Sequence, residues 1–137
     1  MTKAILITML AISLTSCELI VIGTKKREPV IDIAQTSAIG AVYLFKTELD
    51  SNNVPAATQV LARPDGSYYL AIEQYYQYFE IARIGRLLRQ EPITRLKADT
   101  LSEDNVKVSV EFNYLKNFTF TTSRIDSNWY IVSYEGS

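Results

Sequence analysis

Regular alternation of apolar and polar residues fills the last third of the chain and limits the possible folds more than any other feature. In its clearest stretch the apolar side occupies every second position, at Val106, Val108, Val110, Phe112 and Tyr114. A period of two in β-branched and aromatic residues indicates strands with two different faces. Short polar breaks between such strands join them as hairpin neighbours. The sequence therefore predicts an antiparallel meander of four strands, near residues 93–101, 106–114, 118–123 and 129–134.

Three stretches upstream of this region have the spacing of helices. Residues 31–49 place apolar side chains three and four positions apart, which predicts a helix there. If that helix starts later, Thr36 or Ser37 could be its N-cap. A second, shorter helix is predicted over 54–61, with Pro55 in its first turn, where a missing N–H is tolerated.

The third predicted helix, residues 68–90, is rich in aromatic residues. Its apolar stripe comprises Ile72, Tyr75, Tyr76, Phe79, Ala82 and Arg86, and it is widened by Leu70, Ile81, Ile84 and Leu88. The solvent side is predicted to carry Glu73, Gln77 and Glu80. A helix this apolar is expected to be largely covered, by the sheet on one side and the first helices on another.

Helices followed by strands are typical of the α+β class, and 137 residues correspond to one domain. We therefore expect the helices to pack on the sheet within residues 31–137. A net charge of −1 argues against a nucleic-acid partner. The chain has no histidine, which removes the commonest metal ligand and the commonest general base. No metal and no cofactor is predicted.

The first residues have the features of a signal that targets a protein to the cell envelope. Lys3 precedes an apolar run over residues 4–14, and Leu14-Thr15-Ser16-Cys17 follows. This motif resembles the lipobox of bacterial lipoproteins. The resemblance implies a signal peptide over residues 1–16, a lipid on the Cys17 thiol, cleavage before Cys17, and acylation of the new amino terminus, for example with palmitate. Residues 17–30 would then form the lipidated cysteine and a tether.

A different interpretation of the same region is an uncleaved signal anchor that extends through residues 19–22. Lys25, Lys26 and Arg27 would then keep the rest of the chain in the cytoplasm. In the lipoprotein interpretation, residue 18 is Glu, whereas an aspartate there resembles an inner-membrane retention signal. We therefore expect the outer membrane, with the inner membrane as the alternative.

The order of elements over residues 34–134 resembles the nuclear transport factor 2-like family, the cystatin-like α+β cone. The resemblance depends on a helix pair ending near Leu61, a long aromatic helix, and a closing strand that starts at Trp129. It implies a curved four-stranded antiparallel sheet around the helices, with a pocket at its wide end. Members often have a short strand or hairpin between the second and third helices, and residues 63–67 leave little room for one.

Aromatic and arginine side chains are the candidate site residues. Tyrosines suit a pocket or a protein interface because they join an apolar body to a polar tip. Core and rim packing is the competing explanation for the aromatic residues, and helix-dipole complementation competes for the arginines near the helix end. The candidates for a pocket or interface are Tyr75, Tyr76, Phe79, Arg83, Arg86, Tyr114 and Trp129.

These features predict a lipid-anchored, non-catalytic binding or interaction module of the bacterial cell envelope. Its partner would be an envelope protein or a small apolar or anionic ligand, and a homodimer through the sheet is a further option. One alternative is an isomerase or hydratase that uses a Tyr–carboxylate pair in an apolar pocket, where burial raises the carboxylate pKa. Another is a structural subunit of an envelope complex.

Overall fold

Three helices precede four strands in the computed structural model, which describes residues 30–137. This is the predicted α+β order. The predictions for the signal peptide, Cys17 and most of the tether lie outside the described residues. The elements are α2 (Ala38–Asp50), α3 (Val54–Gln59), α4 (Ala71–Leu88), β1 (Ile93–Ser102), β2 (Asn105–Phe112), β3 (Lys116–Ile125) and β4 (Asn128–Gly136).

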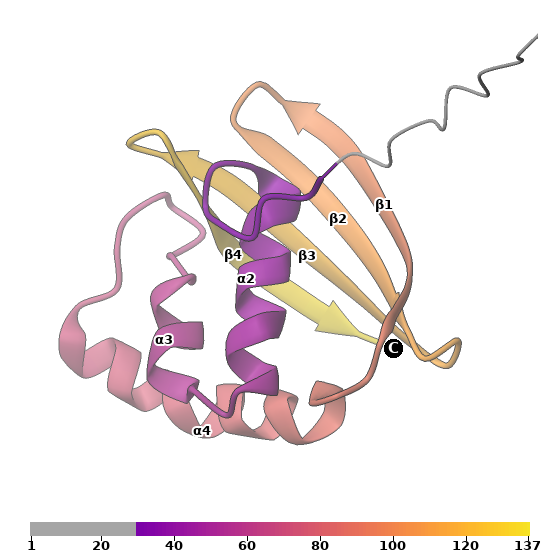
Figure 1. Ribbon diagram of the computed structural model, residues 1–137. Coiled ribbons are helices and arrows are strands. Elements are labelled where there is room, and N and C mark those ends of the chain that lie inside the picture. The colour runs from indigo at the N-terminus through magenta and orange to yellow at the C-terminus, as the bar shows by residue number, and fades with distance from the viewer. Residues whose placement is uncertain (1–29) are drawn as a thin grey trace, which may run out of the picture. The chain divides into compact units, whose positions relative to one another are not determined.

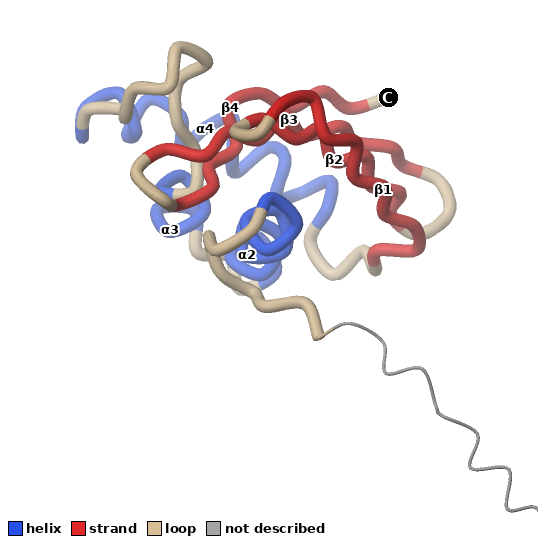
Figure 2. Tube along the Cα trace, turned by 90° about the horizontal axis from the view of Figure 1, so that it is seen from above, coloured by secondary structure: helices blue, strands red, loops and turns tan. Residues whose placement is uncertain are grey.

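The strands form one antiparallel sheet in the order β1-β2-β3-β4, which confirms the predicted meander. All three helices lie on one face of this sheet, so that the fold has two layers (Figure 2). Helix α2 runs across the covered face, and α4 lies at the end of α2 where Asp50 is located (Figure 1). The segment before α2 lies at the opposite end of that helix (Figure 1).

The core forms between α2 and the inner face of the sheet. Phe45 of α2 meets Phe120 of β3 edge to face, with 5.9 Å between the ring centroids. Phe112 and Phe118 continue this aromatic layer, and all four rings are buried. The alternation in the sequence thus correctly identified the inward side of β2 and β3.

Helix α2 begins seven residues later than the predicted start at residue 31. Ser37 adopts an extended backbone, and its hydroxyl oxygen accepts a hydrogen bond from the Gly40 amide at 2.9 Å, as an N-cap does. The preceding residues bind the sheet instead of extending the helix. The Trp129 amide donates to the Gln35 carbonyl at 2.8 Å, and the Gln35 side chain donates to the Trp129 carbonyl at 2.9 Å.

Residues 60–62 end the second predicted helix early because they pair with the free edge of β4. The Ile131 amide donates to the Val60 carbonyl at 2.9 Å, and the Ala62 amide donates to the Ile131 carbonyl at 3.0 Å. Leu61 forms a single parallel bridge with Ile131. This short pairing covers the edge of the sheet that would otherwise be open at β4.

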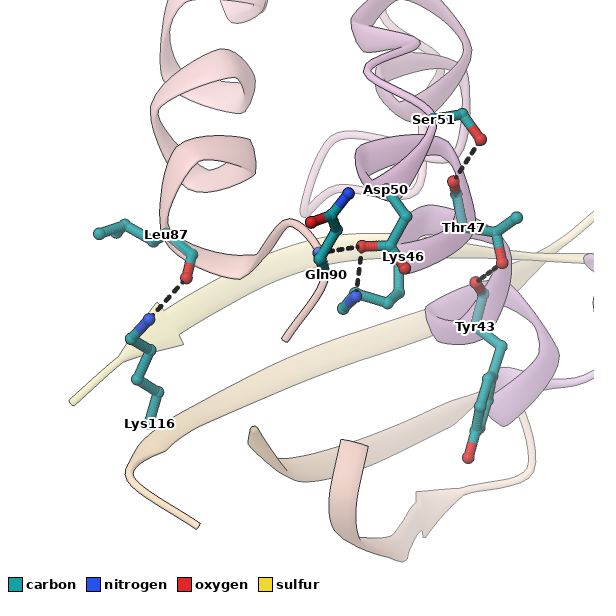
Figure 3. A network of polar contacts seen from close by, with 8 residues as sticks. All are labelled: Tyr43, Lys46, Thr47, Asp50, Ser51, Leu87, Gln90 and Lys116. Atoms are coloured by element: carbon teal, nitrogen blue, oxygen red, sulfur yellow. Dashed lines mark hydrogen bonds and ion pairs between the residues drawn. The ribbon is translucent and has the colours of Figure 1, made fainter. Parts of the chain in front are cut away.

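Helix α4 is shorter than predicted at both ends, for local reasons. At its start the Glu73 carboxylate accepts a hydrogen bond from the Leu70 amide at 2.7 Å, which caps the first turn. At its end Gln90 has a positive φ of 60°, and its amide donates to the Asp50 carboxylate at 2.7 Å. Asp50 also binds the buried Lys46 ammonium at 2.5 Å, so one carboxylate joins the ends of α2 and α4 (Figure 3).

The final strand contains a bulge that turns Tyr134 toward the inner face of the sheet. Thr122 pairs with Ile131 while Thr121 pairs with Ser133, which is a bulge in β4. Tyr134 therefore pairs with the inward-facing Phe120 and lies partly buried, instead of sharing the outer face with Tyr130 as its spacing predicts. The alternation of apolar and polar residues in the sequence does not reveal a bulge of this kind.

Gly40 permits the close approach of the lead-in segment to α2, and this predicts a sharp contrast between two glycines. A Cβ at Gly40 would overlap the carbonyl oxygens of Ala34 and Asp32, whereas one at Gly85 would meet Leu49 at an ordinary 3.6 Å. We expect Gly40→Ala to lower the free energy of unfolding by about 1–3 kcal/mol. Gly85→Ala should raise it by up to about 1 kcal/mol because alanine favours helix.

Chemical denaturation of the two variants beside the wild type measures both changes. Equal effects of the two substitutions would contradict the close packing at Gly40.

Candidate functional site

The solvent-exposed face of α4 carries a row of large apolar side chains. Ile72, Tyr75, Tyr76 and Phe79 are 56%, 57%, 69% and 82% exposed. They recur at the three- and four-residue spacing of one helix face, and Arg83 and Arg86 continue the same line. We call these six residues the α4 stripe.

The α4 stripe lies opposite the side of the helix that packs against the domain. The buried residues of α4 are Ile81, Ile84, Gly85 and Leu88, all in its C-terminal half. At 100° per residue their mean direction is about half a turn from that of the stripe. The prediction that the domain covers this stripe is therefore wrong. Helix α4 has two apolar faces, and the face with Ile81, Ile84 and Leu88 is the one that packs in the core.

An apolar groove of about 300 Å³ borders the α4 stripe. Val54 of α3 forms one wall, and the remaining walls come from α4 at Tyr75, Tyr78, Phe79 and Ala82. Tyr75 and Tyr78 pack with 5.5 Å between their ring centroids. One side of the groove is thus aromatic, and the exposed Phe79 ring belongs to its lining. Of its lining, the sequence analysis had selected Tyr75 and Phe79 as site residues.

Two ion pairs define the charge beside the stripe. Glu80 binds Arg83 through two hydrogen bonds, one of them 2.9 Å from Nε, and this pairing lowers the pKa of the Glu80 carboxyl. The Glu73 carboxylate accepts a hydrogen bond from the Leu70 amide and also pairs with Arg63. Both contacts lower the pKa of Glu73. Arg86 is exposed and forms no ion pair within residues 30–137. The C-terminal end of the stripe is consequently the more positive one.

A second hollow, of about 340 Å³, lies between α4 and the ends of β3 and β4. The bulge in β4 places Tyr134 in its wall, and burial raises the pKa of that phenol. The charged side chains around the hollow are already paired: Arg83 binds Glu80, and Lys116 binds Glu91 at 3.0 Å. Among the carboxyls with a perturbed pKa in residues 30–137, all are shifted downward: Asp65, Glu73, Glu80 and Glu91.

The structure separates Tyr114 and Trp129 from the other candidate residues. Tyr114 lies in the turn after β2, with a positive φ of 62°, and its amide donates to the Thr94 hydroxyl at 3.1 Å. It therefore leaves the row of inward residues to which its spacing assigned it. Trp129 packs partly buried against the core, and its backbone amide donates to the Gln35 carbonyl. Tyr75, Tyr76, Phe79, Arg83 and Arg86 are brought together on one face.

The arginines near the end of α4 also make separate contacts. Arg83 pairs with Glu80, while Arg89 donates to the Asn52 side chain, and Arg95 is exposed on β1. Arg86 is the member that remains on the stripe without an ion pair in the described part of the chain.

A hydrogen bond between loops predicts an unusual tyrosine titration. The Tyr68 hydroxyl donates to the Asp126 carboxylate at 2.8 Å, and this bond raises the pKa of Tyr68 to about 12. Because the folded pKa exceeds the ordinary value of about 10, the bond stabilises the fold below pH 10. That contribution should disappear as the pH rises from about 10 to about 12.

Subtracting the phenolate absorbance of Tyr68→Phe from that of the wild type isolates this titration. A difference centred near pH 12 is expected, and one centred near pH 10 would contradict the bond. Asp126→Asn should move the Tyr68 titration back toward its ordinary range.

Comparison with known proteins does not extend these observations, because the sequence matches neither a protein-family model nor a curated protein. Within residues 30–137, each helix is too short or too polar to cross a bilayer. The same residues hold no group of three or more Asp, Glu, His or Cys side chains arranged to bind a metal ion.

Proposed function

We propose that this protein is a non-catalytic interaction module whose working surface is the α4 stripe, held at a bacterial cell envelope by lipid on Cys17. The observation that carries the proposal is the exposure of three aromatic rings on the face of α4 opposite the core. Exposed apolar patches of this kind mark interaction sites in soluble domains. Tyrosine and arginine, which make up four of the six residues of the α4 stripe, are also enriched at interface hot spots.

The lipid anchor is proposed from the motif at residues 14–17, and it would hold the domain and its α4 stripe at a membrane. A tether of about a dozen residues reaches at most roughly 40 Å, which keeps the domain close to the membrane. The outer membrane is the favoured site because residue 18 is Glu, and the inner membrane is the alternative. The partner of the stripe would accordingly be another component of the envelope.

The finer fold assignment belongs to the same proposal. We infer a nuclear transport factor 2-like cone, which the order of the elements supports. The pairing of residues 60–62 with β4 lies between α3 and α4, where members of that family often have a short strand. The inner face of the sheet is filled by phenylalanine rings, so the proposed binding surface is on α4 and not inside the cone.

The enzyme alternative has less support. It needs a carboxylate with a raised pKa beside a tyrosine in an apolar pocket. In the hollow that contains Tyr134, the neighbouring carboxylate is Glu80, whose pKa is lowered by Arg83. An ionised, paired carboxylate of this kind is a weak general base.

Site-specific photo-cross-linking in intact cells tests the interaction surface. A photoreactive phenylalanine analogue at Tyr76 is expected to give a discrete cross-linked product. The same analogue at Tyr114, which is 78% exposed but lies off the stripe, serves as the matched control. Equal products from both positions, or none from position 76, would contradict the proposal.

A further inference from the structure

We propose that the α4 stripe binds the same stripe of a second copy of this chain, as two antiparallel helices related by a two-fold axis near Phe79. This inference rests on the proposed function, because it names the partner of the proposed interaction surface. A two-fold interface requires a self-complementary patch, in which each feature meets its counterpart on the other copy. The stripe and its groove satisfy that requirement.

The protruding feature is Phe79, and the receiving feature is the groove beside it. Phe79 is 82% exposed, while the groove of about 300 Å³ has Tyr75, Tyr78 and Ala82 in its walls. These wall positions lie within about one turn of residue 79 on the helix. A two-fold axis near Phe79 therefore places each Phe79 ring over the groove of the other copy. Because the axis is two-fold, the grooves of both copies are filled in the same way.

The charges of the stripe fit an antiparallel arrangement better than a parallel one. Arg83 lies four residues after Phe79 and Tyr75 lies four residues before it, so the axis brings Arg83 of one copy over Tyr75 of the other. A guanidinium over a tyrosine ring is an attractive contact. By the same count Arg86 meets Ile72 of the second copy, along which its aliphatic stem can pack. The arginines of the two copies lie at opposite ends of the interface.

The exposed area also suits a second copy. At about 200 Å² for each aromatic side chain, the exposed fractions of Tyr75, Tyr76 and Phe79 amount to roughly 400 Å². Ile72 and the two arginine stems enlarge this toward the roughly 800 Å² per partner that a standard interface buries. Lipid anchoring would confine both copies to one membrane surface, and such confinement raises their effective concentration.

The sheet is a less suitable surface for the predicted homodimer than α4 is. Its outer face presents polar residues such as Lys107, Ser109 and Glu111. The open edge at β1 has irregular pairing near both ends and an ion pair between Lys97 and Asp99. Irregularities and charges on an edge strand oppose pairing with another strand.

Disulfide trapping in the full chain tests the arrangement. The sequence has one cysteine, Cys17, whose thiol is blocked by lipid if the proposed anchor is correct. Mild oxidation of envelopes that contain Phe79→Cys is expected to give a disulfide-linked dimer. Lys107→Cys, on the outer face of the sheet, provides the exposed control and should give none.

Light scattering of the detergent-solubilised protein provides the second measurement. The wild type should have the protein mass of two chains, and Phe79→Asp should halve that mass. Because the side chain is exposed, the far-ultraviolet circular dichroism of Phe79→Asp should stay unchanged, which excludes misfolding as the cause.

The outcomes separate this inference from the proposed function. A wild type of one-chain mass, without a disulfide dimer through position 79, would overturn the pairing. If position 76 still cross-links to a different protein, the interaction module stands and only the second copy is excluded. A dimer through position 79 in protein that carries no lipid would uphold the pairing and remove the anchor.

Discussion

Replacement of Cys17 by alanine is expected to abolish lipid modification and cleavage together. If residues 14–17 act as a lipobox, the wild type made in a bacterium should begin at Cys17, lack residues 1–16, and carry the added mass of acyl chains. Each buried methylene contributes roughly 0.8 kcal/mol to membrane binding, so two or three chains anchor a protein firmly. The Cys17→Ala variant should keep its signal peptide and have the unmodified mass of 15.5 kDa.

Intact-mass spectrometry of the two purified proteins decides the matter. The uncleaved signal anchor predicts full-length, unmodified chains for both, since Cys17 would then have no chemical role. Finding that result would remove the lipid anchor from the proposed function. A Ser16→Ala variant, which keeps the cysteine and a small residue before it, serves as the control for substitution near the cleavage site.

Two phenylalanines on different helices should respond to the same substitution to very different extents. Phe45 is 1% exposed and packs edge to face on Phe120, whereas Phe79 is 82% exposed. We expect Phe45→Ala to lower the free energy of unfolding by about 3–5 kcal/mol, because it removes buried surface and leaves a cavity. This is a large part of the stability of an ordinary domain. Phe79→Ala should change it by no more than about 0.5 kcal/mol when both proteins are measured as single chains, at a concentration too low for pairing.

Urea denaturation of both variants measures the contrast. It bears directly on function, because a large ring that contributes nothing to the stability of the fold is free to bind a partner. A loss of several kcal/mol for Phe79→Ala would mean that the ring belongs to the core, and it would contradict the exposure of the α4 stripe.

The sheet could be predicted from the sequence because its signal is local. The period of two along residues 106–112 and 118–122 identifies the buried side of β2 and β3 directly. The pattern failed where the backbone departs from regular geometry. A bulge turns Tyr134 inward, and a left-handed turn takes Tyr114 out of the sheet. Neither departure changes the spacing of apolar residues, so a count of positions does not detect it.

The orientation of α4 could not be predicted for a different reason. The helix has apolar residues on two opposite faces, and spacing alone does not say which one meets the core. That choice depends on where α2 and the sheet lie, which is tertiary information. One signal was available: Arg83 and Arg86 continue the α4 stripe, while Ile81, Ile84 and Leu88 form a face free of charge. Charged residues on a stripe indicate that it ends in solvent.

Hydroxyl-radical footprinting of the wild-type protein tests the role of the α4 stripe most directly. It compares native envelopes with a detergent solution dilute enough for light scattering to give the mass of one chain. Tyr114 and Leu115, each 78% exposed in a turn away from α4, provide the internal control. If the stripe is the interaction surface, labelling of Tyr75, Tyr76 and Phe79 should fall several-fold in envelopes while labelling of the turn stays constant. Equal labelling of the stripe in both preparations would mean that it has no partner in the envelope, and the proposed function would be wrong.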